Sequence, residues 1–263
     1  MHEGITMRIF TVGDVVGRSG QDLLREVLPS FKRLKGVDLC IVNGENAAPG
    51  NGITPEAFNH MMTSGADVIT TGNHAYRRRE SYDLFDEKEF LIRPANFPER
   101  NPGKGFCKVD FGRYQVGVIN IMGRTYMEPL ENPFTKVDEL LNELDDCKIT
   151  LVDFHCEATS EKRAMGFYLD GRASVVFGTH THVQTADEQI LPHGTGYITD
   201  LGMTGPIQSV LGVEPEIIIG KFKTGMPARF ELTEGESYLN GCLFDIDEKT
   251  GKTTGVERVQ LRS

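Results

Sequence analysis

The sequence predicts an α/β protein in which two sheets pack against each other with helices outside, and three observations support this fold class. Short apolar runs alternate with amphipathic segments in the first part of the chain, as in strand–loop–helix units. The last part has apolar runs separated by turn residues, which favours antiparallel strands. With 263 residues, 39% of them hydrophobic, the chain can bury one large core without disulfide bonds.

Three strands are predicted in the first part of the chain. Residues 7–12 form a short apolar run that ends at Gly13 and Asp14, which indicates a buried strand closed by a loop. Similar runs at residues 39–42 and 68–71 each end in a polar loop as well. Their regular alternation with helical segments favours a mainly parallel or mixed sheet.

Two helices are predicted between these strands. Ser19 is expected to cap the first helix, in which Pro29 makes a kink or a break. Thr54 followed by Pro55 is a favourable start for the second helix, because Thr caps the first turn and Pro is tolerated at the first helical position. This second helix is expected to end near Gly65.

The remaining elements complete the predicted layers. A hairpin is expected around Gly112 and Arg113, between strands at residues 106–111 and 114–120. Next come a helix at 137–144, a strand at 149–154, a helix at 160–165 and a strand at 173–177. The tail is predicted to be antiparallel, with strands at 196–199, 228–232, 239–245 and 256–261. Because no linker or repeat occurs, residues 7–263 are expected to form one domain after an N-terminal extension, residues 1–6.

Composition excludes several classes of function. The net charge of −10 argues against strong binding to duplex nucleic acid, which needs a basic surface. The five cysteines are odd in number and include no CxxC pair, so a reduced, cytoplasmic protein is expected. No apolar stretch approaches the roughly 20 residues of a membrane span, and the N-terminus lacks the pattern of a signal peptide, so no membrane partner is expected.

Five predicted strands end in a polar loop that carries a residue able to bind a metal ion. In chain order these residues are Asp14, Glu45 with Asn46, Asn73 with His74, His155, and His180 with His182. Because ligands of open α/β sheets gather beyond the carboxyl ends of the strands, the five loops are expected to converge on one crevice. Glycines at the start of these loops permit close approach of the backbone.

The chemistry of this set favours a hydrolytic metal centre. Carboxylate, amide and imidazole groups without thiolate favour iron, manganese or zinc. Two divalent or mixed-valence ions would outweigh the two carboxylates and attract a phosphoryl group despite the acidic surface. Two ions ~3.5–4 Å apart lower the pKa of a bridging water and bind the attacking and leaving oxygens. His74 can protonate the leaving alkoxide, since its neighbour Asn73 is the more suitable ligand.

The ordered motifs resemble those of a known enzyme superfamily. They are Gly13-Asp14-Val15-Val16-Gly17, Asn43-Gly44-Glu45-Asn46, Gly72-Asn73-His74, Asp153-Phe154-His155-Cys156-Glu157 and Gly178-Thr179-His180-Thr181-His182. Their order and spacing are similar to those of the calcineurin-like metallophosphoesterases, and among them to the bacterial YmdB-like branch. The similarity extends from Met7 to about Gly205. It implies a four-layer αββα sandwich of two mixed sheets, a dinuclear metal site and phosphodiesterase activity on a 2',3'- or 3',5'-cyclic nucleotide.

The resemblance also implies a role for each residue. One metal ion would be bound by Asp14, Asn46 and His182, the other by Asn73, His155 and His180, and both by Glu45. His74 would be the proton donor. The chain departs from the wider superfamily in two places, because Val16 stands where a His ligand is usual and Glu45 where the bridging residue is usually Asp. Asn46 would fill the position that Val16 leaves.

Several residues near these motifs also fit simpler interpretations. Asn46 fits a local Asx turn in a loop rich in Gly and Pro. Glu157 is expected either to orient a metal ligand or to be a solvated charge. Arg77 is a candidate contact to phosphate, although a run of three arginines is more often a solvated face. Cys156 is expected to be a packing residue rather than a nucleophile, since no other feature of acyl transfer accompanies it.

Three functions remain open from the sequence. The first is a metal-dependent phosphodiesterase that acts on a small phosphodiester or nucleotide. The second is a nucleotide- or RNA-responsive regulatory protein whose metal site binds ligand with little turnover. The third is a phosphomonoesterase. The sequence leaves open the native substrate, the identity of the metal ions and whether the chain forms a homo-oligomer.

Overall fold

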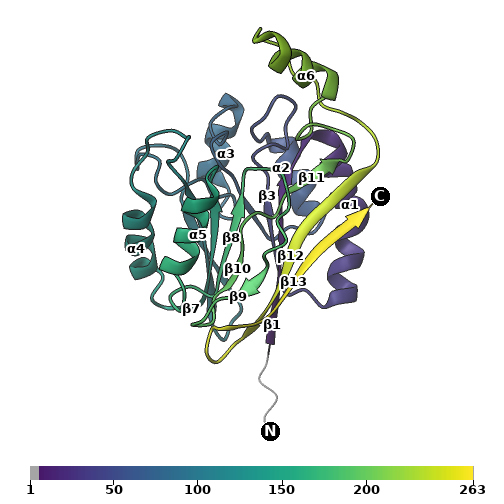
Figure 1. Cartoon of the computed structure of the whole chain (residues 1–263). Coiled ribbons are helices and arrows are strands. Elements are labelled where there is room, and N and C mark those ends of the chain that lie inside the picture. The colour runs from purple at the N-terminus through teal and green to yellow at the C-terminus, as the bar shows by residue number, and fades with distance from the viewer. Residues whose placement is uncertain (1–5, 263) are drawn as a thin grey trace.

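The computed structural model describes residues 6–262, which fold into four layers in the order helix, sheet, sheet, helix (Figure 1). This is the αββα sandwich expected from the motifs. Of the expected N-terminal extension, residues 1–5 lie outside the described residues. Thr6 already pairs with Asp247 as the first residue of a strand, so the described fold begins one residue earlier than expected.

The first sheet has seven strands in the order β2-β11-β12-β1-β3-β4, with β13 paired to β12. Their bounds are β1 Thr6–Val12, β2 Asp14–Val15, β3 Leu39–Asn43, β4 Val68–Thr70, β11 Met203–Pro206, β12 Ser237–Asp247 and β13 Thr253–Arg262. Strands β1, β3 and β4 run parallel, so their carboxyl ends lie at the same edge of the sheet. The antiparallel pair β12 and β13 is the predicted C-terminal hairpin.

The second sheet has six strands in the order β5-β6-β7-β8-β10-β9. Their bounds are β5 Phe106–Asp110, β6 Gln115–Met122, β7 Cys147–His155, β8 Val175–Thr179, β9 Gln189–Ile190 and β10 Gly196–Ile198. Strands β6, β7, β8 and β10 are parallel, while β5 and β6 form the predicted hairpin. The carboxyl ends of β7 and β8 therefore also share one edge.

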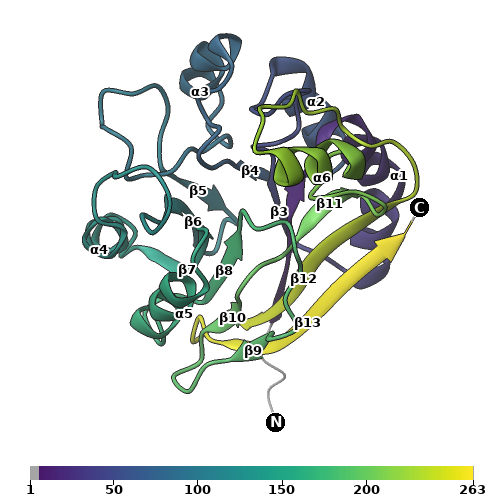
Figure 2. The same cartoon turned by 45° about the horizontal axis from the view of Figure 1, so that its top comes forward.

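Helices cover the outer face of each sheet (Figures 1 and 2). Helices α1 and α2 lie on the first sheet, and α4 and α5 lie on the second. The helices are α1 Gly17–Lys35, α2 Pro55–Thr63, α3 Tyr82–Glu87 after the 3₁₀ turn Arg79–Ser81, α4 Pro133–Glu143, α5 Thr159–Tyr168 and α6 Pro215–Thr224. Helix α6 stands apart from the layers at the top of Figure 1.

Alternation along the strands explains why the layers hold together. In β1, Ile9 faces the core between the two sheets and Phe10 faces the core under α1, because successive strand residues point to opposite faces. Both side chains are fully buried, and each such burial stabilises the fold by about 1.5–3 kcal/mol. On α1, Leu24 and Leu28 form the matching apolar stripe.

The structure corrects the predicted first helix. It begins at Gly17 with Val16 as the N-cap residue, and no side chain caps it, so Ser19 is not the cap. Pro29 lies inside the helix and does not end it, so the predicted break is wrong. The reason is tertiary packing: residues on both sides of Pro29, such as Leu28 and Phe31, are buried against the first sheet, and this burial outweighs the loss of one backbone hydrogen bond.

The predicted tail also needs correction. Residues 228–232 are not a strand, since only Leu232 is paired, in an isolated bridge to Val213. Residues 226–231 are exposed and lack a neighbouring strand, without which a β-propensity pattern forms no ladder. Strand β10 pairs in parallel with β8, not only in antiparallel fashion as expected. Helices α3 and α6 were not predicted.

Candidate metal centre

The predicted site residues all lie at the carboxyl-end edges of the two sheets. Asp14 begins β2 directly after β1, while Glu45 and Asn46 follow β3, and Asn73 and His74 follow β4. From the other sheet, His155 is the last residue of β7, and His180 and His182 follow β8. The face-to-face packing of the sheets brings these loops together beyond the carboxyl ends of the strands, where α/β folds usually bind their ligands.

One cluster of ligand atoms surrounds the ring of His155. Its Nε2 atom lies 3.0 Å from Asn73 Oδ1, 3.0 Å from His180 Nδ1 and 3.3 Å from Glu45 Oε2. One ring nitrogen carries at most one hydrogen, so it cannot satisfy three such neighbours by hydrogen bonding. Ligand atoms of Glu45, His155 and His180 all lie within 4.8 Å of one another.

These separations fit a transition-metal ion. Zinc and similar ions bind imidazole nitrogen and carboxylate oxygen at about 2.0–2.2 Å, so neighbouring ligand atoms are about 3.0 Å apart at right angles and about 3.4 Å apart in a tetrahedron. The three contacts of His155 Nε2 lie in that range. The mixed donor set of nitrogen and oxygen without sulfur agrees with iron, manganese or zinc.

A second cluster joins Asp14, Asn46 and His182. Asn46 Nδ2 lies 3.4 Å from Asp14 Oδ1 and 3.1 Å from His182 Nε2, and the last two atoms are 3.7 Å apart. Asn46 therefore directs its side chain into the cluster rather than into its own loop. In the structure its amide nitrogen faces these atoms, so binding of a cation requires a half-turn of the amide that brings Oδ1 to the same place.

Glu45 lies between the two clusters and faces both. Its Oε1 atom is 2.9 Å from Asn46 Nδ2, while Oε2 is 3.3 Å from His155 Nε2. The Glu45 side chain is 1% exposed, so it is buried between the two clusters. One oxygen toward each cluster is the arrangement that a bridging ligand needs.

His74 stands beside the clusters and not within them. Its Nδ1 atom is 2.9 Å from Glu45 Oε1, and its backbone nitrogen donates to Glu45 Oε2 at 3.1 Å. Its Nε2 atom lies 3.2 Å from Asn51 Nδ2, a contact that the sequence did not predict. Arg78 supports this contact by donating to the Asn51 carbonyl at 3.1 Å. Arg77 is exposed, and its contact to phosphate stays a prediction.

Polar contacts behind the clusters orient each imidazole ring. His155 Nδ1 contacts Thr179 Oγ1 at 2.9 Å, and that hydroxyl donates to Asp153 Oδ1 at 2.6 Å. His182 Nδ1 donates to a backbone carbonyl at 3.1 Å, and His180 Nε2 lies 3.1 Å from Glu157 Oε2. Such partners set which ring nitrogen faces a metal ion. Glu157 thus contacts a predicted ligand, although its side chain is half exposed.

The buried charges of the site depend on one another. Burial opposes ionisation of Glu45, but the His155 and His74 imidazoles outweigh it and hold the pKa of Glu45 well below its usual range. For His155, burial lowers the pKa, yet the adjacent Glu45 carboxylate raises it to about 9. For Asp14, burial outweighs the nearby histidines and raises the pKa. Burial, together with His155, lowers the pKa of His180 to about 3.

Two neighbouring residues have separate explanations. A Cβ atom on Gly72 would clash with His155 Nε2 and Glu45 Oε2, so the loop after β4 needs glycine to approach the site. Cys156 is fully buried, and burial raises the pKa of its thiol to about 12. A protonated, buried thiol agrees with the predicted packing role rather than with a nucleophile.

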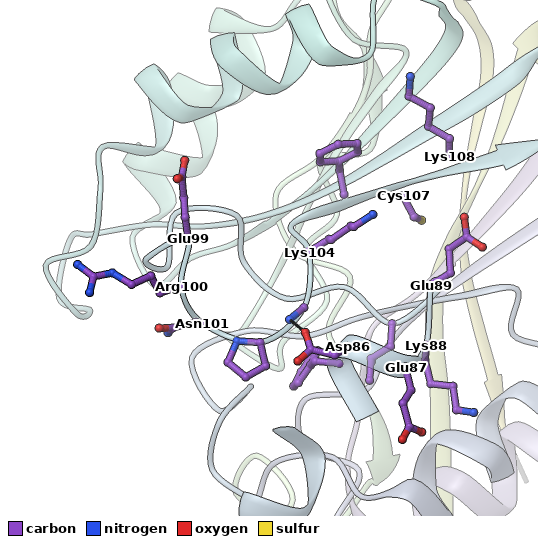
Figure 3. A pocket seen from close by; sticks show the side chains of 15 residues that line it. Asp86, Glu87, Lys88, Glu89, Glu99, Arg100, Asn101, Lys104, Cys107 and Lys108 are labelled. Atoms are coloured by element: carbon purple, nitrogen blue, oxygen red, sulfur yellow. Dashed lines mark hydrogen bonds between the residues drawn. The ribbon is translucent and has the colours of Figure 1, made fainter. Parts of the chain in front are cut away.

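A cavity of about 360 Å³ opens beside the clusters and is lined by Asn73, His180, Tyr126, Met127 and Glu128. A larger cavity of about 740 Å³ lies between α3 and β5 (Figure 3). Its wall includes charges of both signs, such as Glu89 and Lys104, and none of the cluster residues. The smaller cavity is therefore the one that leads to the site.

Among the described residues, no helix is both long and apolar enough to cross a membrane.

Comparison with known proteins places this geometry in a family. A family model described as YmdB-like protein matches residues 10–259. A 2',3'-cyclic-nucleotide 2'-phosphodiesterase from Bacillus subtilis is 50% identical over 256 residues, which are 97% of each chain. A hypothetical protein from Thermus thermophilus has a TM-score of 0.93 at 39% identity, covering 98% of this chain and 100% of its own. A structure described as a novel phosphatase from Mycoplasma pneumoniae has a TM-score of 0.94 at 34% identity, covering 98% of this chain and 94% of its own. The chain belongs to the family of YmdB-like proteins, as its motifs predicted.

Proposed function

We propose that this chain is a metal-dependent phosphodiesterase that hydrolyses a small phosphodiester, in the first place a 2',3'-cyclic nucleotide. The observation that supports it is the pair of clusters joined by Glu45, with His74 on the same carboxylate. The name of the Bacillus subtilis relative directs the choice of substrate.

The ligands proposed for the first ion are Asp14, Asn46 and His182, those for the second are Asn73, His155 and His180, and Glu45 serves both. Two bound ions, iron or manganese with zinc as the alternative, would supply a hydroxide nucleophile and neutralise phosphate charge. Their charge would also offset the acidic surface of the chain, whose net charge is −10.

His74 is the proposed general acid. When its Nδ1–H donates to Glu45 Oε1, the other ring nitrogen, Nε2, is directed toward Asn51. Nε2 is then the atom that can hold a proton for the leaving alkoxide, which is the 2'-oxygen of a 2',3'-cyclic ester. The Glu45 carboxylate fixes the orientation of the ring, and 27% of the His74 side chain is exposed, so substrate can reach it.

The test compares hydrolysis of 2',3'- and 3',5'-cyclic nucleotides and of bis(p-nitrophenyl) phosphate by the manganese- and iron-loaded protein. We expect Asp14→Ala to abolish turnover and His74→Ala to lower it by about 10²–10⁴, the usual contribution of a general acid. His193→Ala is the matched control, because His193 is 75% exposed and contacts Asp170 instead of the clusters. Unchanged rates in both site variants would refute the proposal.

The same assay separates the other functions. The Mycoplasma pneumoniae structure is described as a phosphatase, so the substrate set includes the monoester 3'-AMP. A higher kcat/KM for the monoester than for every diester would make the chain a phosphomonoesterase. Tight nucleotide binding without product would instead favour a regulatory role.

We also propose a cytoplasmic location, which the five free cysteines support.

A further inference from the structure

Tyr126 is an aromatic side chain held in an unusual state. It is 91% exposed, and its backbone has a φ of 63°, in the left-handed region that bulky residues rarely adopt. Among the described residues, no hydrogen bond or ring contact involves its side chain. Exposure and backbone strain both cost free energy without a visible gain inside the chain, and such outliers gather at functional sites.

The loop that carries Tyr126 is firmly anchored. The Glu161 carboxylate on α5 accepts hydrogen bonds from the backbone nitrogens of Arg124, at 3.0 Å, and Thr125, at 2.9 Å. The backbone nitrogen of Met127 then donates to the Arg124 carbonyl at 3.2 Å, which closes a turn around Tyr126. The exposed ring is therefore presented by a defined turn.

The position of this turn indicates what the ring faces. Tyr126, Met127 and Glu128 line the same cavity as Asn73 and His180, two proposed metal ligands. Its volume of about 360 Å³ lies in the range of small-ligand sites. If the phosphate of a ligand lies at the proposed metal centre, the part of the ligand away from the phosphate therefore reaches this loop.

We propose that residues 126–128 form a nucleobase subsite in which the base of the substrate stacks on the ring of Tyr126. The inference rests on the proposed function and names the part of the substrate that lies away from the phosphate. Aromatic stacking accepts every base, because each has a flat π-face. The subsite therefore distinguishes nucleotides from cyclic phosphates that lack a base, and discriminates little among the bases.

The kinetic test uses 2',3'-cyclic AMP and base-less ribose 2,3-cyclic phosphate with the metal-loaded protein. Loss of one stacked base lowers kcat/KM roughly 5- to 150-fold, so we expect that loss in Tyr126→Ala for the nucleotide only, mainly through KM. Tyr126→Phe keeps the ring and should retain most activity. Phe167→Ala is the control, since Phe167 is 55% exposed and outside the cavity. Equal effects of Tyr126→Ala on both substrates, or none, would overturn the subsite.

A binding test does not depend on turnover. The chain contains no tryptophan, so Tyr126→Trp places its single tryptophan in the proposed subsite. We expect 3'-AMP to quench its fluorescence and ribose 3-phosphate to leave it unchanged, while equal responses would contradict stacking. If the wild-type protein hydrolyses neither cyclic phosphate, the proposed function fails. If it hydrolyses both and Tyr126→Ala matches the wild type, the subsite alone fails.

Discussion

Lys162 on α5 forms a buried ion pair that fixes the loop carrying His180 and His182. Its ammonium is 2.5 Å from Asp200 Oδ2 and 2.8 Å from the Thr179 carbonyl, with both charged side chains 2% exposed or less. Asp200 also accepts a hydrogen bond from the backbone nitrogen of Thr181 at 3.1 Å. The two histidines have φ values of 101° and 64°, so this loop needs outside contacts to keep its shape.

Replacing Lys162 by Met keeps most of the length of the side chain and removes its ammonium group, which leaves the Asp200 carboxylate buried without a cation. Breaking such a pair costs about 3–5 kcal/mol, because the remaining charge is neither hydrated nor paired. For a chain of this size, a loss of 1 kcal/mol in the free energy of unfolding lowers Tm by roughly 2–4 °C, so Tm should fall by about 6–20 °C. The loosened loop should also retain less metal.

The assay is urea and thermal unfolding of the metal-free protein, since bound metal would add its own stabilisation. Arg18→Met is the control, because Arg18 and Asp22 form an exposed pair that is worth about 0–1 kcal/mol. The double variant Lys162→Met/Asp200→Asn should recover most of the lost free energy of unfolding, because neither buried charge remains. A Lys162→Met protein within about 1 kcal/mol of the wild type would refute this reasoning.

Three further predictions concern the metal centre itself. Gly72→Ala should abolish metal loading, because its Cβ would clash with His155 and Glu45, and elemental analysis checks this; normal loading would contradict the close approach of this loop to the site. Thr179→Val should weaken metal binding about 10- to 100-fold, because it removes the hydroxyl that links His155 to Asp153, while Thr179→Ser should keep the affinity for metal. Equal affinities of Thr179→Val and the wild type in a chelator competition would argue against this link. Chelation should lower Tm, and restored Mn²⁺ should raise it, whereas a Tm independent of metal would mean that the folded site binds none.

The sequence predicted which residues lie together at the candidate site because these residues follow local rules. Each lies at the end of a strand, and apolar runs with a polar closing loop are visible in the chain itself. Residues that act through pairing between strands were missed. Thr179 contacts His155 because the register of β7 and β8 places the two residues side by side. Asp153 was part of a motif, but its role depends on the same register.

The fold was predicted in its layers but less well in its details. Thr54 caps α2 as expected, since its hydroxyl accepts from the Ala57 nitrogen three residues on, a local interaction. Ser19 failed as a cap because the turn after β2 starts α1 earlier, at Gly17. Helix α6 was missed because its exposed Phe222 and Ile219 give no single buried face from which a helix could be predicted.

Two metal ions joined by Glu45 are the proposed source of the phosphodiesterase activity of this chain. The most direct measurement is the metal content per chain of protein reconstituted with manganese or iron, taken together with its rate on 2',3'-cyclic AMP. We predict about two ions per chain and hydrolysis that chelation abolishes, both lost in Glu45→Gln. Hydrolysis that survives complete removal of metal, or a fully loaded protein without any diesterase activity, would contradict the account.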